Sequence, residues 1–280
     1  MYNTEKRKTI IFIGGTSRSG STLLDLILGN NDKSMSLGEI SSVYHPTKKK
    51  HFALIKELND SDSVWGSIIN DKKKHLYDNI IEAFPDIDIF IDSSKDPLWI
   101  NYFNRKLRGR YDVRNVLIYK KPEELANSFM KRGYGNRWLK TFIHYHRKYN
   151  TLINDYFTVY LGDLLKREDV LVELCRTLGV SYHENMRNYY GNNKTIFYGS
   201  ETPKKKKELD ANPKENVDSI ISGSTSKKIN ETYTLLKAKN LLTSKTGKRD
   251  EYFTYNKLYI LSLKIKRYFN YLLNYIKFKL

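Results

Sequence analysis

Short apolar runs alternate along the chain with longer segments whose apolar residues recur at helical spacing. Strands are expected at about 9–13, within 86–97, at the start of 114–133 and at 157–161. Helices are expected at about 20–28, along an apolar stripe from Trp65 to Ile81, after Pro122, and at about 136–154 and 166–178. This alternation predicts an α/β domain with a central, mostly parallel sheet flanked by helices.

The pattern is less regular in three regions. Residues 36–51 show no clear period and are expected to form an irregular loop. Residues 199–230 are rich in Lys, Pro, Gly and Ser and are expected to be a loop-rich part of one domain covering 1–245. Residues 246–280 regain helical spacing with interspersed Lys and Arg, which predicts a basic amphipathic helix. Packing on the domain or self-association is favoured for this helix over weak contact with a membrane surface, because tyrosines occur on both faces.

Size and composition indicate a globular protein. One cysteine, Cys175, in 280 residues excludes an internal disulfide framework, and it favours a cytoplasmic location. The first apolar run is too short for a signal peptide, and no stretch approaches the ~18 apolar residues of a membrane span. The net charge of +18 favours anionic partners, but abundant Lys, Asn, Ile and Tyr make coding bias an equal explanation.

The sequence TIIFIGGTSRSGSTLL reads as a strand, a glycine turn and a helix, the arrangement of a phosphate-binding loop. The Walker pattern overlies Gly15 to Thr22, but Ser21 stands where that pattern has lysine. Backbone N–H groups at the helix start form an anion site, and Arg18 supplies the cation. A sulfuryl group carries one negative charge where a phosphoryl group carries two, so it needs less neutralisation and no metal.

The loop SRSGSTLL resembles the 5′-phosphosulfate loop of the sulfotransferases that use 3′-phosphoadenosine 5′-phosphosulfate (PAPS). The family's second signature is matched about a hundred residues later by Lys120, Pro122 and Ser128 in LIYKKPEELANSF. The resemblance covers roughly residues 9 to 200. It implies a P-loop-like three-layer fold, transfer of a sulfuryl group from PAPS to a hydroxyl or amine, and release of adenosine 3′,5′-bisphosphate (PAP).

The resemblance also implies roles for individual residues. Arg18 is expected at the transferring sulfuryl group, and Lys120 and Ser128 at the 3′-phosphate. Lys120 stands where the family usually has arginine, so one bidentate contact is lost; Lys121 or Arg132 could compensate. The residues expected to hold the donor's 5′ end are Ser17, Arg18, Ser19, Gly20, Ser21, Thr22 and Leu23.

The general base for the acceptor is expected to be Glu39, which follows the first helix. His45 is the second candidate and His51 a weaker one, since a structural role is commoner for both histidines. The sequence DSSK at a strand end offers Lys95 to the sulfuryl oxygens, while Asp92 is expected to orient its neighbours. Lys204 to Lys207 form either a basic segment over the 3′-phosphate or a solvated charge run.

Two other functions stay open on the sequence alone. A P-loop kinase is one, with Asp92 as the aspartate that holds Mg²⁺, but its lysine is missing at position 21. A non-enzymatic basic protein that binds nucleic acid or lipid is the other, though it leaves the paired motifs unexplained. For the leading hypothesis the acceptor is a small molecule, glycan or lipid, and no nucleic-acid partner is expected.

Overall fold

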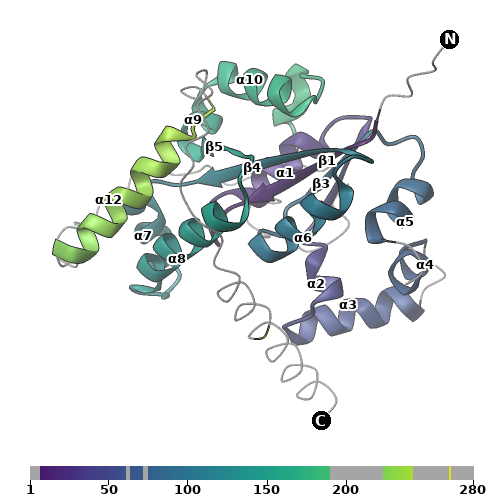
Figure 1. Ribbon diagram of the computed structural model, residues 1–280, viewed down its shortest axis with the longest axis horizontal. Helices are drawn as coiled ribbons and strands as arrows, with labels where there is room; N and C mark the ends of the chain where they lie inside the picture. The colour runs from purple at the N-terminus through teal and green to yellow at the C-terminus, as the bar shows by residue number, and fades with distance from the viewer. Residues whose placement is uncertain (1–6, 61–63, 72–74, 190–222, 242–264, 266–280) are drawn as a thin grey trace.

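The computed structural model describes residues 7–60, 64–71, 75–189, 223–241 and 265 (Figure 1). Within these residues the strands form one parallel sheet in the order β2-β3-β1-β4-β5. Their bounds are β1 (Thr9–Gly14), β2 (Ser34–Gly38), β3 (Ile89–Asp92), β4 (Asp112–Tyr119) and β5 (Phe157–Tyr160). The predicted α/β class with a parallel sheet is therefore confirmed.

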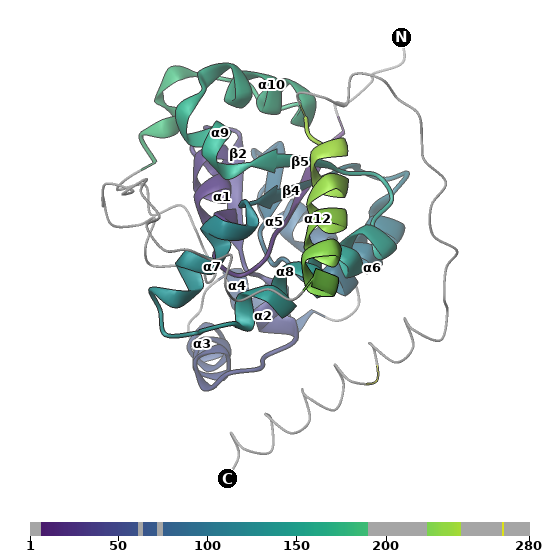
Figure 2. The same cartoon turned by 90° about the vertical axis from the view of Figure 1, so that its left-hand side faces the viewer.

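Helices cover both faces of this sheet (Figures 1 and 2). Among the described residues they are α1 (Ser21–Gly29), α2 (Ser41–Tyr44), α3 (Lys49–Asp60), α4 (Val64–Asn70), α5 (Leu76–Ala83), α6 (Pro97–Leu107), α7 (Pro122–Met130), α8 (Arg137–Leu152), α9 (Leu161–Lys166), α10 (Glu168–Leu178), the 3-10 turn η1 (Glu184–Arg187) and α12 (Gly223–Ala238). The described helices include none that is long and apolar enough to cross a membrane.

Side chains of β1 alternate between two apolar clusters. Ile10 and Phe12 pack with residues of α5, α6 and α8, whereas Ile11 and Ile13 pack with residues of α1, α9 and α10. All four side chains are fully buried, as expected for a central strand covered on both faces. The sheet is thus the middle layer of three, and β1 runs through its centre.

Two sequence-based expectations about local structure were wrong. The region 36–51 is not an irregular loop, because β2 adds to the sheet beside β3, and α2 and the start of α3 follow. The serines of β2 break the apolar pattern that predicts a buried strand, although Ser34 and Ser36 are buried in the folded protein. The single apolar stripe from Trp65 to Ile81 belongs to two helices, since α4 ends at Asn70 and α5 begins at Leu76.

The end of the predicted loop-rich segment is also helical. From Gly223 onward the chain forms α12, with Ile229 and Leu236 buried although its first residues are Gly and Ser. At its end, the Thr158 hydroxyl of β5 donates to the Leu236 carbonyl (2.6 Å), and just beyond it the Thr158 N–H donates to the Lys239 carbonyl (2.8 Å). Docking on the sheet edge therefore outweighs the weak local propensity. Lys204 to Lys207 and, apart from Ile265, the tail helix predicted over 246–280 lie outside the described residues.

Candidate functional site

The predicted motifs meet at one edge of the sheet because all strands are parallel. β1 ends at Gly14, β2 at Gly38, β3 at Asp92 and β4 at Tyr119. Gly14 pairs with Leu117, so the glycine loop and the Lys120 turn leave adjacent strands side by side. Ligands of open parallel sheets bind at this carboxyl edge, which makes it the candidate site.

The glycine loop is shaped by close contacts that a side chain would block. A Cβ on Gly14 would lie 2.2 Å from Cε2 of Tyr149, so α8 packs directly against the loop. Gly20 has a left-handed backbone (φ 103°) and precedes α1, whose N-terminus receives no hydrogen bond from a capping side chain. The first N–H groups of a helix have no carbonyl partner within it, and here they face the loop's end. This is the geometry that binds an anionic oxygen cluster.

Arg18 and Lys120 bring positive charge to the same place. Burial lowers the pKa of Lys120, and the Arg18 guanidinium lowers it further by repulsion. The pKa of Arg18 is also lowered, first by burial and then by repulsion from Arg132. Arg18, which belongs to the loop, is therefore close enough to both Lys120 and Arg132 for their charges to interact. An anion bound there would relieve the repulsion, so the residues present fit a phosphorylated ligand.

The second half of the predicted signature lies on α7. Pro122 is its first residue, and Ser128 is a half-buried residue near its end. Lys121 places its ammonium over the Tyr160 ring, 5.2 Å from the ring centre. Of the two cations expected to compensate for lysine at position 120, Arg132 is therefore the better placed, because it is electrostatically coupled to Arg18.

Lys95 and Glu39 form an ion pair across the ends of β2 and β3. The Lys95 Nζ donates to Glu39 Oε1, and the side chains are 19% and 31% exposed. Arg18 (φ 71°) and Lys95 (φ 64°) have left-handed backbones and, of the residues that the structure describes, no other non-glycine residue has a positive φ. Such strain commonly gathers at functional sites. The pair is partly open to solvent and can be reached by an acceptor.

Asp92 has the orienting role expected for it. Its buried carboxylate accepts hydrogen bonds from the Tyr77 hydroxyl (2.5 Å), the Trp99 Nε1–H (2.7 Å) and the Ser94 N–H (2.7 Å). Burial raises its pKa. Because both oxygens already accept hydrogen bonds, Asp92 holds the DSSK turn and is poorly placed to bind Mg²⁺.

The histidines lie beside the site. His45 is half-buried and packs edge-on against Trp99, with ring centres 5.8 Å apart. The buried His51 accepts a hydrogen bond from the Thr47 N–H at Nδ1 (3.1 Å), and burial lowers its pKa, so it stays neutral. Of the three candidate bases, Glu39 is the one that forms an ion pair with Lys95, another candidate site residue.

Two polar groups of the site, a buried one and a half-buried one, escaped the sequence reasoning. The Asp25 carboxyl on α1 accepts a hydrogen bond from the Ser93 hydroxyl (2.6 Å), and burial raises its pKa to about 7. Tyr145 on α8 hydrogen-bonds to both the glycine loop and Lys95. Asp25 could have been found as the one charged residue in the apolar helix STLLDLILG. Nothing local distinguishes Tyr145 among 22 tyrosines.

Comparisons with known proteins identify the fold. The chain matches no family model and no curated protein sequence. Among solved structures it is similar to the sulfotransferase domain of the Synechococcus PCC 7002 olefin synthase, with 18% identity over 84% of this chain and 98% of that domain, and a TM-score of 0.59. It is also similar to the sulfotransferase domain from the curacin biosynthetic pathway, with 16% identity over 93% of this chain and 99% of that domain, and a TM-score of 0.52.

These domains share the three-layer arrangement described above, so the likeness inferred from the two sequence motifs is confirmed for the fold. At this level of identity the comparison carries no information on the donor or the acceptor. The chain has the P-loop-like α/β fold of sulfotransferase domains.

Proposed function

We propose that the protein transfers a sulfuryl group from PAPS to a hydroxyl or amine of a small molecule, glycan or lipid. The observation that carries this proposal is that the glycine loop and the Lys120 turn leave adjacent parallel strands at the same edge of the sheet, since Gly14 of β1 pairs with Leu117 of β4. The two motifs that suggested the donor are about a hundred residues apart in the chain, yet they lie side by side at this edge.

The residues divide between the two ends of the donor. The N–H groups at the start of α1, from Ser21 to Leu23, would hold the 5′-phosphate. Lys120, Ser128 and Arg132 would hold the 3′-phosphate. Ser17 and Ser19 belong to the turn that sets the loop's shape, and the Ser19 N–H donates to the Thr16 carbonyl (3.2 Å).

The ion pair of Glu39 and Lys95 would carry out the transfer chemistry in this proposal. When bound, PAPS supplies a sulfuryl group that carries one negative charge, and its loss leaves PAP. Glu39 would accept the proton of the acceptor hydroxyl or amine. Arg18 and Lys95 would stabilise the negative charge that develops on the oxygens around sulfur. His45 stays a second candidate for the base.

The test is transfer of labelled sulfate from PAPS to acceptors in a cell extract or a panel of alcohols, sugars and lipids. Arg18→Ala is expected to abolish labelling. Arg105→Ala on α6 is the control, because it removes the same positive charge at an exposed position away from the loop. Chelation of Mg²⁺ should leave labelling intact. Labelling that survives in Arg18→Ala would refute the role of Arg18. Absence of labelling from PAPS, together with Mg²⁺-dependent transfer of phosphate from labelled ATP, would favour a kinase.

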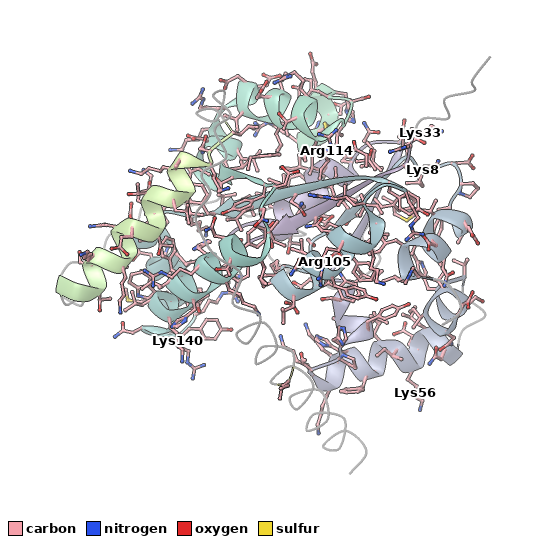
Figure 3. All side chains as sticks on the ribbon, in the orientation of Figure 1. Lys8, Lys33, Lys56, Arg105, Arg114 and Lys140 are labelled. Carbon is pink, nitrogen blue, oxygen red and sulfur yellow. The ribbon has the colours of Figure 1, made fainter. Side chains whose placement is uncertain are left out.

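We propose no nucleic-acid partner for the basic protein. The six basic side chains labelled in Figure 3 come from six different segments of the chain. Lys8 and Lys33 hold the turn before β3, since their ammonium groups donate to the Pro85 and Asp86 carbonyls. Retention on DNA, with no change in melting temperature on adding PAP, would overturn this view.

A further inference from the structure

The hydroxyl of Tyr145 connects two loops that are distant in sequence. It accepts a hydrogen bond from the Gly15 N–H (2.7 Å) and donates one to the Lys95 carbonyl (2.5 Å). Burial raises its pKa, so the hydroxyl keeps the proton that it donates. Gly15 begins the glycine loop, and Lys95 ends the DSSK turn. A single side chain of α8 thus contacts both halves of the candidate site.

The hydrogen bond to the Lys95 carbonyl holds a residue with an unusual backbone conformation. Lys95 has a left-handed backbone (φ 64°), which a residue with a Cβ adopts only when its surroundings hold it there. The same residue carries the ammonium that pairs with Glu39. A change in the backbone at Lys95 would therefore move the ion pair, although Tyr145 itself is bonded to neither charged group in the structure.

The ring of Tyr145 is held by its own neighbours. It stacks with Tyr149 (ring centres 6.1 Å apart), which packs against Gly14, and it meets His146 edge-on (5.6 Å). Tyr149 in turn packs edge-on against Tyr156 (4.9 Å). The hydroxyl is therefore presented from a packed aromatic row, and its position depends little on solvent-exposed side chains.

We propose that Tyr145 is a positioning residue that couples the glycine loop to the Lys95–Glu39 pair. Through its two hydrogen bonds, the backbone that receives the donor and the backbone that carries Lys95 keep one fixed separation. This inference rests on the proposed sulfotransferase function for its catalytic consequence, but the coupling itself is a property of the protein without ligand.

The activity test uses Tyr145→Phe, which removes the hydroxyl and keeps the ring. Transfer at saturating PAPS is expected to fall at least about tenfold, while the Kd for PAP changes less than about threefold, because the N–H groups that bind the anion lie on α1. The control is Tyr156→Phe, which removes a hydroxyl bonded to Asn150 (3.0 Å) from the same aromatic row. An unchanged rate, or equal losses in rate and PAP affinity, would overturn the proposal.

Hydrogen exchange tests the coupling without relying on activity. In the full-length protein without nucleotide, Tyr145→Phe should speed amide exchange in two separate peptides, one containing Gly15 and the other Lys95. With PAP bound, the wild-type protein should gain protection in the Lys95 peptide, and the variant should not. If neither peptide changes in the variant, the bridge is refuted. If wild type shows no PAP binding, the proposed function fails, and the nucleotide-free exchange still decides the coupling.

Discussion

Asp25→Asn is expected to make the protein more stable, by an amount that grows with pH. Asp25 is fully buried on α1, and its pKa is raised from 3.8 to about 7 because burial penalises the carboxylate. The Ser93 and Ser36 hydroxyls hydrogen-bond to it and favour the charged form, but they offset only part of that penalty. Asparagine has the same shape, keeps an oxygen for the Ser93 hydroxyl and carries no charge.

The sign follows from the two pKa values. The folded state holds the proton up to about pH 7, whereas the unfolded chain releases it near 3.8. The stability that protonated Asp25 contributes is therefore complete below pH 3.8 and is lost as the pH rises towards 7. At 1.36 kcal/mol per pKa unit, the full loss is about 4 kcal/mol. Between pH 5 and pH 8 the advantage of Asp25→Asn should grow by about 2–3 kcal/mol.

Urea unfolding followed by circular dichroism at pH 5, 6.5 and 8 measures this difference. Other groups that titrate in this range cancel when the variant is compared with wild type at each pH. Asp86→Asn, which makes the same chemical change at an exposed position, is the control. A constant gap for Asp25→Asn, or one that shrinks as the pH rises, would show that the buried carboxyl is ionised and stabilised, contrary to the reasoning.

Three further changes test the site. Glu39→Gln should lower transfer by about a hundredfold or more with PAP affinity nearly unchanged, as expected for a general base; equal losses in steady-state rate and calorimetric affinity would make Glu39 a structural residue. Lys120→Ala should weaken PAP binding by about tenfold to a hundredfold but leave binding of adenosine 5′-phosphosulfate, which lacks the 3′-phosphate, unchanged. Lys56→Ala on α3 is the control. Equal losses of affinity for both nucleotides would show that Lys120 does not contact the 3′-phosphate. Gly14→Ala should destabilise the protein by about 1–3 kcal/mol, because the new Cβ would lie 2.2 Å from the buried Tyr149 ring. An unchanged melting temperature would mean that α8 can move away from the loop without loss of stability.

Much of the site was predictable because its parts are local. The glycine loop is a continuous segment, and its turn and helix start follow from Gly14, Gly20 and the apolar residues around them. Lys120, Pro122 and Ser128 also stand in one segment. Parallel strands then place all carboxyl ends at one edge, so the meeting of these segments could be expected before any coordinates.

Other features depend on contacts that no local pattern records. The serines of β2 become strand residues because β3 offers a ladder of backbone partners. The Gly and Ser residues at the start of α12 are helical because Ile229 and Leu236 find an apolar surface to cover. In both cases tertiary burial outweighs a weak propensity.

By itself, the sequence determined the class of fold and the places of the glycine loop and the Lys120 segment, since each follows from residues close together in the chain. Only the tertiary structure decided that Lys95 pairs with Glu39, that Asp25 is buried beside Ser93, and that Tyr145 joins the loop to Lys95. These interactions form when helices dock on the two faces of the sheet, and their energies depend on burial and distance, which sequence spacing does not encode.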